Sequence, residues 1–154
     1  MTEMDSYHYP ASARTLHFGL RVTDADRSLA FYRKLGYEVV GTVPNTPMGP
    51  LTMLKLPRDD WVTLELVSAS GSSGRAGGSI NHFVVGVPSM HAALAALETR
   101  GVDVGPATSH DPAGEMQTAW LSDPDANRIE LVQWPPGHPD GMTAADFAAD
   151  DRDA

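Results

Sequence analysis

The chain repeats itself at a fixed offset, and this repeat constrains the fold more than any other feature. When the sequence is shifted by 65 positions without a gap, His17 coincides with His82 and Glu65 with Glu130. The same shift superposes apolar and turn-forming positions: Val22 and Val87, Leu29 and Leu94, Gly36 and Gly101, Leu56 and Leu121, and Asp60 and Asp125. Only six of the 154 residues are histidine, so two of them meeting in register is informative. We therefore expect two copies of one module.

Each copy has the same order of expected elements. Strand-like apolar runs in the first copy are TLHFGLRV (15–22), YEVVGTV (37–43), LTMLKL (51–56) and WVTLELV (61–67). In the second copy they are SINHFVVGV (79–87), VDVGPA (102–107), QTAWLS (117–122) and NRIELVQW (127–134). One helix is expected in each copy, capped by the pair Thr23 and Asp24 or by Ser89, and ended by Gly36 or Gly101.

The predicted architecture is α+β, with two tandem βαβββ modules inside one domain. The expected boundaries are 14–134 for the domain, 14–67 for module one, 68–78 for a Gly/Ser-rich linker and 79–134 for module two. Residues 1–13 are expected to form an N-terminal arm. Residues 135–154 form a turn-rich extension with a short helix capped by Thr143.

Composition excludes several classes of protein. A net charge of −9 with scattered Lys and Arg argues against nucleic acid as the main partner. Without cysteine there are no disulfides, no Cys-ligated zinc and no thiol catalysis. The start, MTEMDSYHYPASAR, lacks the basic and apolar segments of a signal peptide, and no apolar run reaches membrane-spanning length. We expect a soluble, cytoplasmic protein.

Strand alternation assigns the polar residues to one face. In the first strand His17, Gly19 and Arg21 oppose the apolar positions, and in the fourth strand Thr63 and Glu65 oppose leucines. The apolar faces should pack on the helices, which leaves His17 and Glu65 together on the other face and suggests a curved sheet around a cavity. A buried carboxylate needs a partner or a metal, because burying it unpaired costs several kcal/mol or more.

His17, Glu65, His82 and Glu130 together form a set of two imidazoles and two carboxylates. Such a set suits zinc, nickel, cobalt, manganese or iron better than calcium. Taken singly, each histidine is better explained by a structural hydrogen bond, and each glutamate by pairing with Arg21 or Arg128. The repeat favours one shared divalent metal ion, since each module then contributes one histidine and one glutamate.

The residues that carry a family resemblance are LHFGLRVTDADRSLAFYRKLGYEVVG (16–41), INHFVVGV (80–87) and DPDANRIELV (123–132). The chain resembles the vicinal oxygen chelate superfamily, the group of glyoxalase I, bleomycin-resistance proteins and extradiol dioxygenases. The resemblance implies paired βαβββ modules that form a curved mixed sheet around a metal-binding cleft. It also implies a homodimer, with the site in one chain or across two.

Within that superfamily, the ligands narrow the expected activity. Glyoxalase I enzymes bind their metal through His, Glu, His and Glu, and these ligands match His17, Glu65, His82 and Glu130. Extradiol dioxygenases use two His and one Glu, and epimerases usually have Gln in place of the first Glu. Bleomycin-type binding proteins lack the ligand set. Arg21 matches an arginine that contacts a carboxylate of glutathione, although pairing with Glu65 or another acidic group is an equal alternative. Ala69 stands where an asparagine contacts the thiol, which puts glutathione itself in doubt.

The resemblance implies a metal-dependent lyase or isomerase of glyoxalase I type. It would convert a 2-oxoaldehyde–thiol hemithioacetal to a 2-hydroxyacyl thioester through an enediolate stabilised by the metal, with Glu130 as the leading base and Glu65 acting on the opposite face. The alternatives are another metal-dependent enzyme, an epimerase or ring-cleaving dioxygenase, or a small-molecule or antibiotic-binding protein. His138 is interpreted as a loop residue, with folding back over the cleft as the alternative. Trp120 and Trp134 are interpreted as core residues, with lining of the cavity as the alternative.

Overall fold

The computed structural model describes residues 16–68, 80–142 and 144–148, and the first module within them has the predicted order. Its elements are β1 (Phe18–Val22), α1 (Ala25–Leu35), β2 (Glu38–Val43), β3 (Leu51–Lys55) and β4 (Leu64–Ser68). The second module contains β5 (His82–Gly86), α2 (Met90–Thr99), β6 (Thr108–Ser109), β7 (Gln117–Ser122) and β8 (Arg128–Gln133). A short helix, α3 (Ala144–Ala148), follows. The expected arm 1–13, nearly all of the linker 68–78, Ala69 and Thr143 lie outside the described residues.

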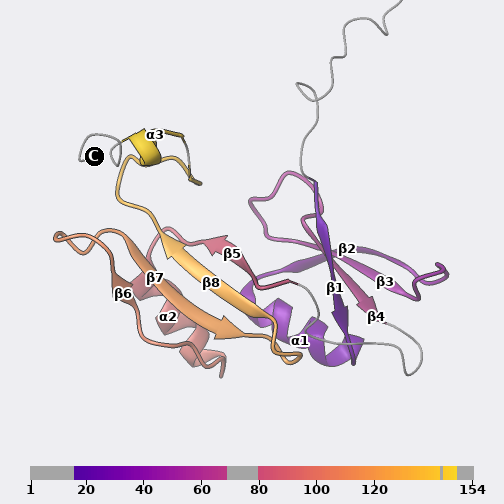
Figure 1. The fold of residues 1–154 in the computed structure, drawn as a ribbon. Coiled ribbons are helices and arrows are strands. Elements are labelled where there is room, and N and C mark those ends of the chain that lie inside the picture. Colours follow the sequence, from indigo (N-terminus) through magenta and orange to yellow (C-terminus); the bar gives the residue numbers. More distant parts are fainter. Residues whose placement is uncertain (1–15, 69–79, 143, 149–154) are drawn as a thin grey trace, which may run out of the picture.

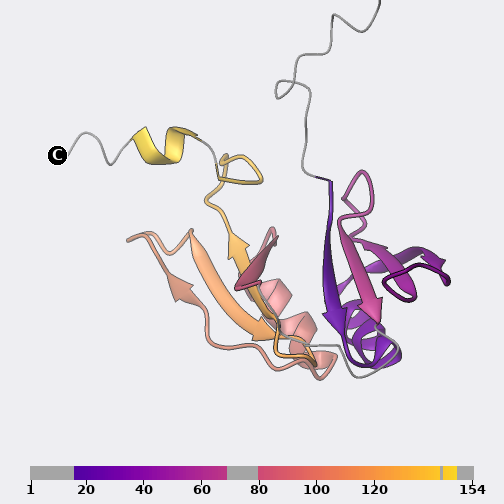
Figure 2. The same cartoon turned by 45° about the vertical axis from the view of Figure 1, so that its right-hand side comes forward.

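The strands form two four-stranded sheets, ordered β1-β4-β3-β2 and β5-β8-β7-β6. In each sheet the first and last strands of the module, β1 with β4 and β5 with β8, pair in parallel, and the remaining neighbours are antiparallel. The prediction of an α+β chain with two tandem βαβββ modules is confirmed. Figures 1 and 2 show the two sheets splayed apart, and each long helix packs on the sheet of its own module, α1 on β4 and α2 on β8. Among the described residues, no helix has the length and apolar character needed to cross a membrane.

The strand register confirms the 65-residue offset for the parallel pairs but not for the whole module. Phe18 faces Leu64 in the first sheet, and Phe83 faces Ile129 in the second, which is the expected correspondence. Leu64 pairs next with Leu54, however, whereas Ile129 pairs with Leu121. The counterpart of Leu121 is therefore Leu54 and not Leu56. The ungapped repeat was wrong at this point, because the connection 56–63 is longer than its counterpart 123–127.

The strand predicted over 102–107 was also wrong. This segment joins no ladder, and the corresponding strand is the two-residue β6 that follows it. The backbone N–H of Gly105 donates to the carbonyl of Trp120 at 2.8 Å, and Pro106 has no N–H with which to continue. Val102 is buried and Val104 packs against the core, so the apolar residues that suggested a strand serve packing instead.

Both long helices begin at the predicted caps, and α1 ends at the predicted Gly36, whereas α2 has Arg100 as its C-cap, one residue before the expected Gly101. The side chain of Asp24 accepts from the N–H of Arg27, and that of Ser89 accepts from the N–H of Ala92. Gly36 has a φ of 115°, in the left-handed region where glycine is favoured, and its N–H caps the last turn of α1. The helices are thus delimited by local chemistry that the sequence makes visible.

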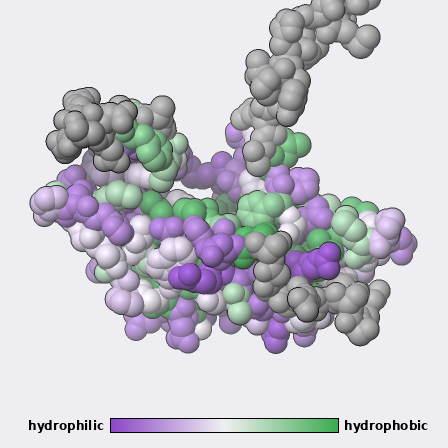
Figure 3. Space-filling model, in the orientation of Figure 1, coloured by the Kyte–Doolittle hydropathy of each residue, from purple (hydrophilic) through white to green (hydrophobic). Residues whose placement is uncertain are grey.

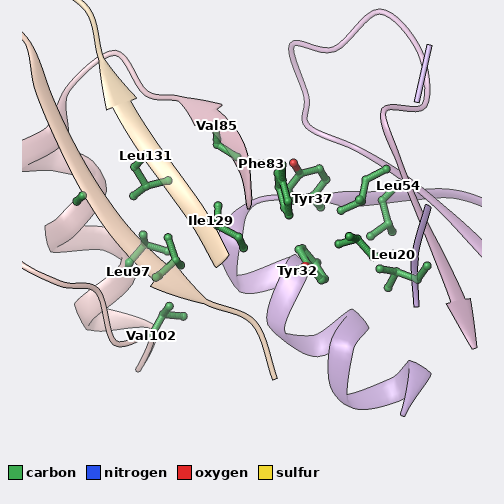
Figure 4. Packing of buried hydrophobic residues seen from close by; sticks show 14 of the residues in the cluster. Leu20, Tyr32, Tyr37, Leu54, Phe83, Val85, Leu97, Val102, Ile129 and Leu131 are labelled. Atoms are coloured by element: carbon green, nitrogen blue, oxygen red, sulfur yellow. The ribbon is translucent and has the colours of Figure 1, made fainter. Parts of the chain in front are cut away.

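One hydrophobic core joins the two modules. Its buried residues come from both sheets and both long helices, as Figure 4 shows for Leu20, Tyr32, Phe83 and Ile129 among others. Tyr32 is fully buried, and its ring stacks on that of Phe83 with 6.4 Å between the centroids. Because the core fills the space between the sheets, the opposite face of each sheet points away from it.

A polar network reinforces this junction at the start of α1. The carboxylate of Asp125 accepts hydrogen bonds from the hydroxyl groups of Thr23 and Ser28, at 2.7 and 3.2 Å. Arg27 also approaches Asp125, at 3.4 Å. Both aspartates of the turn between β7 and β8, Asp123 and Asp125, are buried and thus bind the first module to the second.

Candidate metal centre

The first predicted ligand pair is formed. His17 lies just before β1, and Glu65 lies in β4, where its register partner is Gly19 of β1. Nε2 of His17 is 3.2 Å from Oε2 of Glu65. The glutamate side chain is only 10% exposed, whereas the imidazole is 40% exposed. The pair therefore presents one nitrogen and one oxygen donor at the polar face of the first sheet.

The second predicted pair is formed in the corresponding place. His82 opens β5 and Glu130 lies in the middle of β8, with 3.6 Å between Nε2 and Oε2. Nδ1 of His82 lies 2.8 Å from Oδ1 of Asn81, and in the tautomer that donates Nδ1–H to this oxygen, Nε2 carries the lone pair that a metal would bind. The edge of the His82 ring also meets Trp120, with 5.0 Å between the centroids.

The alternative partners of the two glutamates do not engage them. Within the described residues neither Glu65 nor Glu130 forms an ion pair with Arg21 or Arg128. Arg21 is exposed in β1, where its register partner is Val67. Arg128 stacks on Trp120, with its guanidinium carbon 4.3 Å from the ring centroid. Each carboxylate is therefore paired with an imidazole of its own module, as the offset predicts.

The four residues form two pairs rather than one cluster. In the described part of the chain no three His, Asp or Glu side chains are placed so that they could hold a metal ion together. The arrangement of the sheets explains this separation. The apolar faces meet in the shared core, so the face that carries His17 and Glu65 and the face that carries His82 and Glu130 both point outward.

Each pair fits half of a metal site. Imidazole nitrogen and carboxylate oxygen are donors that zinc, nickel, cobalt, manganese and iron accept. In both pairs the two donor atoms face one another across a distance that two ligands of one ion can span, and the Asn81 contact orients His82 as a ligand's outer partner does. Two such pairs supply two nitrogens and two oxygens.

Trp120 and Trp134 lie elsewhere than the expected core. Trp120 is half-buried on the His82 face, where it is the register partner of Glu130. Trp134 stacks on His138, with 4.2 Å between centroids and 7° between planes. Trp120 could have been placed from the sequence, because strand alternation in β7 puts it on the face opposite the buried Ala119 and Leu121. The return of His138 toward Trp134 through the PPGHPDG turn was the alternative interpretation of His138, which no local pattern favoured.

His138 has a second contact that the sequence did not indicate. Its Nε2 lies 2.6 Å from Oδ1 of Asp146 in α3, and this hydrogen bond is the main cause that raises the pKa of His138 above its ordinary value. The residue borders a cavity of about 490 Å³ between the modules, whose walls include Phe18, Phe83 and Trp134. Figure 3 shows the hollow on this side of the molecule, with apolar surface at its floor. The cavity is bordered by neither His–Glu pair.

Comparison with known proteins shows the family to which the chain belongs. The model of the Glyoxalase/Bleomycin resistance protein/Dioxygenase superfamily matches residues 14–131. A lactoylglutathione lyase of Haemophilus influenzae is 28% identical over 123 residues, which cover 77% of this chain and 90% of the relative. The chain matches the solved structure of the trypanothione-dependent glyoxalase I of Leishmania major with 28% identity and a TM-score of 0.61, covering 92% of this chain and 97% of that one. It matches TnmS3, an antibiotic binding protein of Streptomyces sp. CB03234, with 25% identity and a TM-score of 0.64, covering 81% and 98%. The chain belongs to the Glyoxalase/Bleomycin resistance protein/Dioxygenase superfamily.

Proposed function

We propose that the protein is a metal-dependent lyase of glyoxalase I type. It converts the hemithioacetal of a 2-oxoaldehyde and a thiol to a 2-hydroxyacyl thioester. The observation that carries this proposal is the pair of His–Glu contacts, His17 with Glu65 and His82 with Glu130, at equivalent places in the two sheets. The similarity to a lactoylglutathione lyase over most of the chain supports the same activity.

The complete site is proposed to form between two chains in a cytoplasmic homodimer. Within one chain the two polar faces point apart, so the pair from module one meets the pair from module two of a second copy. The open edges of the sheets support this arrangement. Among the described residues β1 is paired only with β4, and β5 only with β8, so each leaves a free edge at which another strand can add. A twofold dimer of this kind contains two equivalent sites.

His17 and Glu65 of one chain, with His82 and Glu130 of the other, would hold the ion. When bound, a divalent metal stabilises negative charge that develops on two neighbouring oxygens of the substrate. Glu130 takes the proton from the carbon that bears the hydroxyl group and the sulfur and returns it to the former carbonyl carbon, while the hydroxyl proton passes to the oxygen of that carbon, so that the product is the 2-hydroxyacyl thioester. Its contact with His82 is looser, 3.6 Å against 3.2 Å for Glu65, and its side chain is 20% exposed against 10%, so Glu130 has more freedom to move.

Glu65 and Arg21 have supporting roles in this proposal. Glu65 acts on the opposite face of the substrate, where it holds or donates a proton. Arg21 lies on the same strand face as His17, four residues later, and no ion pair with a described residue occupies it. Its guanidinium is therefore available for a carboxylate of the substrate.

Two measurements on the purified protein test the proposal. The metal content should approach one divalent ion per chain, and hemithioacetals of methylglyoxal should be turned over with at least one of several thiols. Glu130→Gln should lower kcat by about a hundredfold or more, the range expected for loss of a positioned base. Bound metal without turnover of any thiol adduct would overturn the glyoxalase activity while leaving the metal site intact.

A second function, binding of a small molecule without catalysis, is favoured by one observation. The 490 Å³ cavity has aromatic walls and is lined by none of the four His and Glu residues, and the chain is similar to the antibiotic binding protein TnmS3. Metal content separates the two functions. A protein that is isolated without metal and takes up none, but binds an aromatic antibiotic, would be a binder and not a lyase.

A further inference from the structure

Arg128 lies on the same face of the second sheet as the ligand pair of that module. It is the register partner of His82 across β5 and β8, and it lies two residues before Glu130 on β8. Its guanidinium carbon is 4.3 Å from the centroid of Trp120, the register partner of Glu130 on β7. The four side chains of His82, Trp120, Arg128 and Glu130 therefore form one compact group.

The stacking explains why Arg128 does not neutralise Glu130. A guanidinium at this position could reach the carboxylate two residues away on the same face, but the indole of Trp120 holds it by a cation–π contact. The guanidinium nitrogens make no hydrogen bond or ion pair with any residue that the structure describes. A stacked arginine uses its face for the ring and keeps the N–H groups along its edge for an acceptor. Glu130 meanwhile remains free for its histidine.

This cation is absent from the equivalent place in module one. The offset that relates Glu130 to Glu65 relates Arg128 to Thr63. By strand register, Met53 pairs with Glu65 where Trp120 pairs with Glu130. The ligand pair of module one is thus formed without a neighbouring arginine or tryptophan, so holding the His–Glu pair does not require them. The Trp120–Arg128 stack is therefore a feature of the second module alone.

We propose that Arg128 is a specificity-determining residue that binds a carboxylate of the substrate beside the metal ligands. This inference rests on the proposed function and names its substrate class: a hemithioacetal that carries a carboxylate close to the reacting carbons. In a chain with a net charge of −9, an anionic substrate is repelled at long range, and a fixed local cation offsets that repulsion. A charge-assisted, bidentate contact with the guanidinium edge supplies direction as well as affinity.

The carboxylate can belong to the thiol or to the oxoaldehyde, and paired substrates separate these sources. For the thiol, methylglyoxal is combined with 3-mercaptopropionate or with its neutral amide, 3-mercaptopropionamide. For the oxoaldehyde, 3-mercaptopropionamide is combined with 4,5-dioxopentanoate or with methylglyoxal. The wild-type protein should prefer the charged member of one pair. Arg128→Gln should lower kcat/KM for that member by about tenfold to a hundredfold, as for loss of a hydrogen bond to a charged group, and leave the neutral member within about twofold.

Two further variants control for charge and for structure. Arg33→Gln removes one positive charge from an exposed position on α1 and should leave the preference unchanged. Arg128→Lys keeps the charge but loses the planar fork, so it should retain part of the preference. Equal loss for the charged and neutral substrates in Arg128→Gln, or no loss for either, overturns the proposal.

A binding measurement on the metal-free protein makes the inference independent of turnover. The indole N–H resonance of Trp120, assigned with Trp120→Phe, is followed by NMR during titration with 3-mercaptopropionate, 4,5-dioxopentanoate and 3-mercaptopropionamide. The resonance should shift with at least one carboxylate, much less with the amide, and not in Arg128→Gln. If the wild-type protein turns over no thiol adduct, the proposed function fails, but this titration still decides whether Arg128 binds a carboxylate. No shift with either carboxylate overturns the inference.

Discussion

The hydroxyl group of Tyr32 donates a hydrogen bond to Oδ2 of Asp123, with 2.7 Å between the oxygens, and so joins helix α1 to the turn between β7 and β8. Both residues are buried. Burial, followed by the charge of Asp123, raises the pKa of Tyr32 well above its usual range, so the phenol remains a donor at any physiological pH. This hydrogen bond connects the first module to the second.

Tyr32→Phe should destabilise the protein by about 1.5–3 kcal/mol, the range for loss of a hydrogen bond to a charged group. The ring and its stacking on Phe83 are kept, so the change isolates the hydroxyl group. Urea unfolding followed by circular dichroism measures the effect as a lower midpoint with an unchanged slope. An unaltered midpoint would show that Asp123 is satisfied without Tyr32, through its contacts with the amide groups of Asn127.

Gly36→Ala should destabilise the protein by about 1 kcal/mol, because a side chain at a φ of 115° is strained. Gly41→Ala is the matched control. An added Cβ at Gly41 meets no atom within 4 Å, and its φ does not lie in the left-handed region. The same unfolding experiment compares the two variants. Equal effects of both substitutions would contradict the role assigned to the backbone conformation at Gly36.

The modules and helix ends were predictable because their signals are local. Asp24, Ser89 and Gly36 mark helix ends through contacts within a few residues, and alternation in β1 and β4 separates Leu20 and Leu64 from the polar face. The partnership of His17 with Glu65, and of His82 with Glu130, also followed from the sequence, because duplicated polar residues in strands share one explanation. These inferences required no knowledge of how the sheets pack.

The remaining features depend on contacts distant in sequence. The ungapped offset matched Leu121 to Leu56, whereas the strand register matches it to Leu54. The pattern of apolar residues does not reveal that the loop before β4 is longer than the loop before β8. Residues 102–107 looked like a strand, since burial of Val102 by packing gives the same pattern as burial by a sheet. The two polar faces point apart because the apolar faces of the sheets meet in the core between them. The position of His138 depends on its contact with Asp146, eight residues later.

The contact between His138 and Asp146 should show a defined pH dependence. Because the hydrogen bond from His138 to Asp146 raises the folded-state pKa of the imidazole, the contact stabilises the folded protein fully below the unfolded pKa of about 6.5, and this stabilisation is lost as the pH rises through the higher folded value. NMR titration of the His138 ring should give a midpoint above 6.5 in the wild-type protein and a lower one in Asp146→Asn. Asp140 and Arg58, which border the same cavity, remain unchanged in both proteins. A midpoint that does not respond to Asp146→Asn would show that the carboxylate is not the cause.

Complementation between two inactive chains should reveal whether the metal site is shared. One variant carries His17→Ala and Glu65→Gln, and the other carries His82→Ala and Glu130→Gln. Each alone should bind little metal, because every site in its homodimer lacks one half. When the two are co-expressed with different tags and the mixed dimer is isolated, intact module one of one chain meets intact module two of the other. The mixed dimer should then hold about half the wild-type metal, since one of its two sites is complete.

The control is the first variant co-expressed with a differently tagged copy of itself, which leaves both sites of the dimer incomplete and should restore nothing. The mixed dimer separates the two possible architectures without relying on turnover. If each site were built within a single chain, neither chain of the mixed dimer would contain an intact site and its metal content would stay at the level of this control. If the mixed dimer recovers both metal and the thioester-forming activity, the two His–Glu pairs form the active site of the proposed lyase. The only intact set of ligands in that dimer is His17 and Glu65 from one chain with His82 and Glu130 from the other.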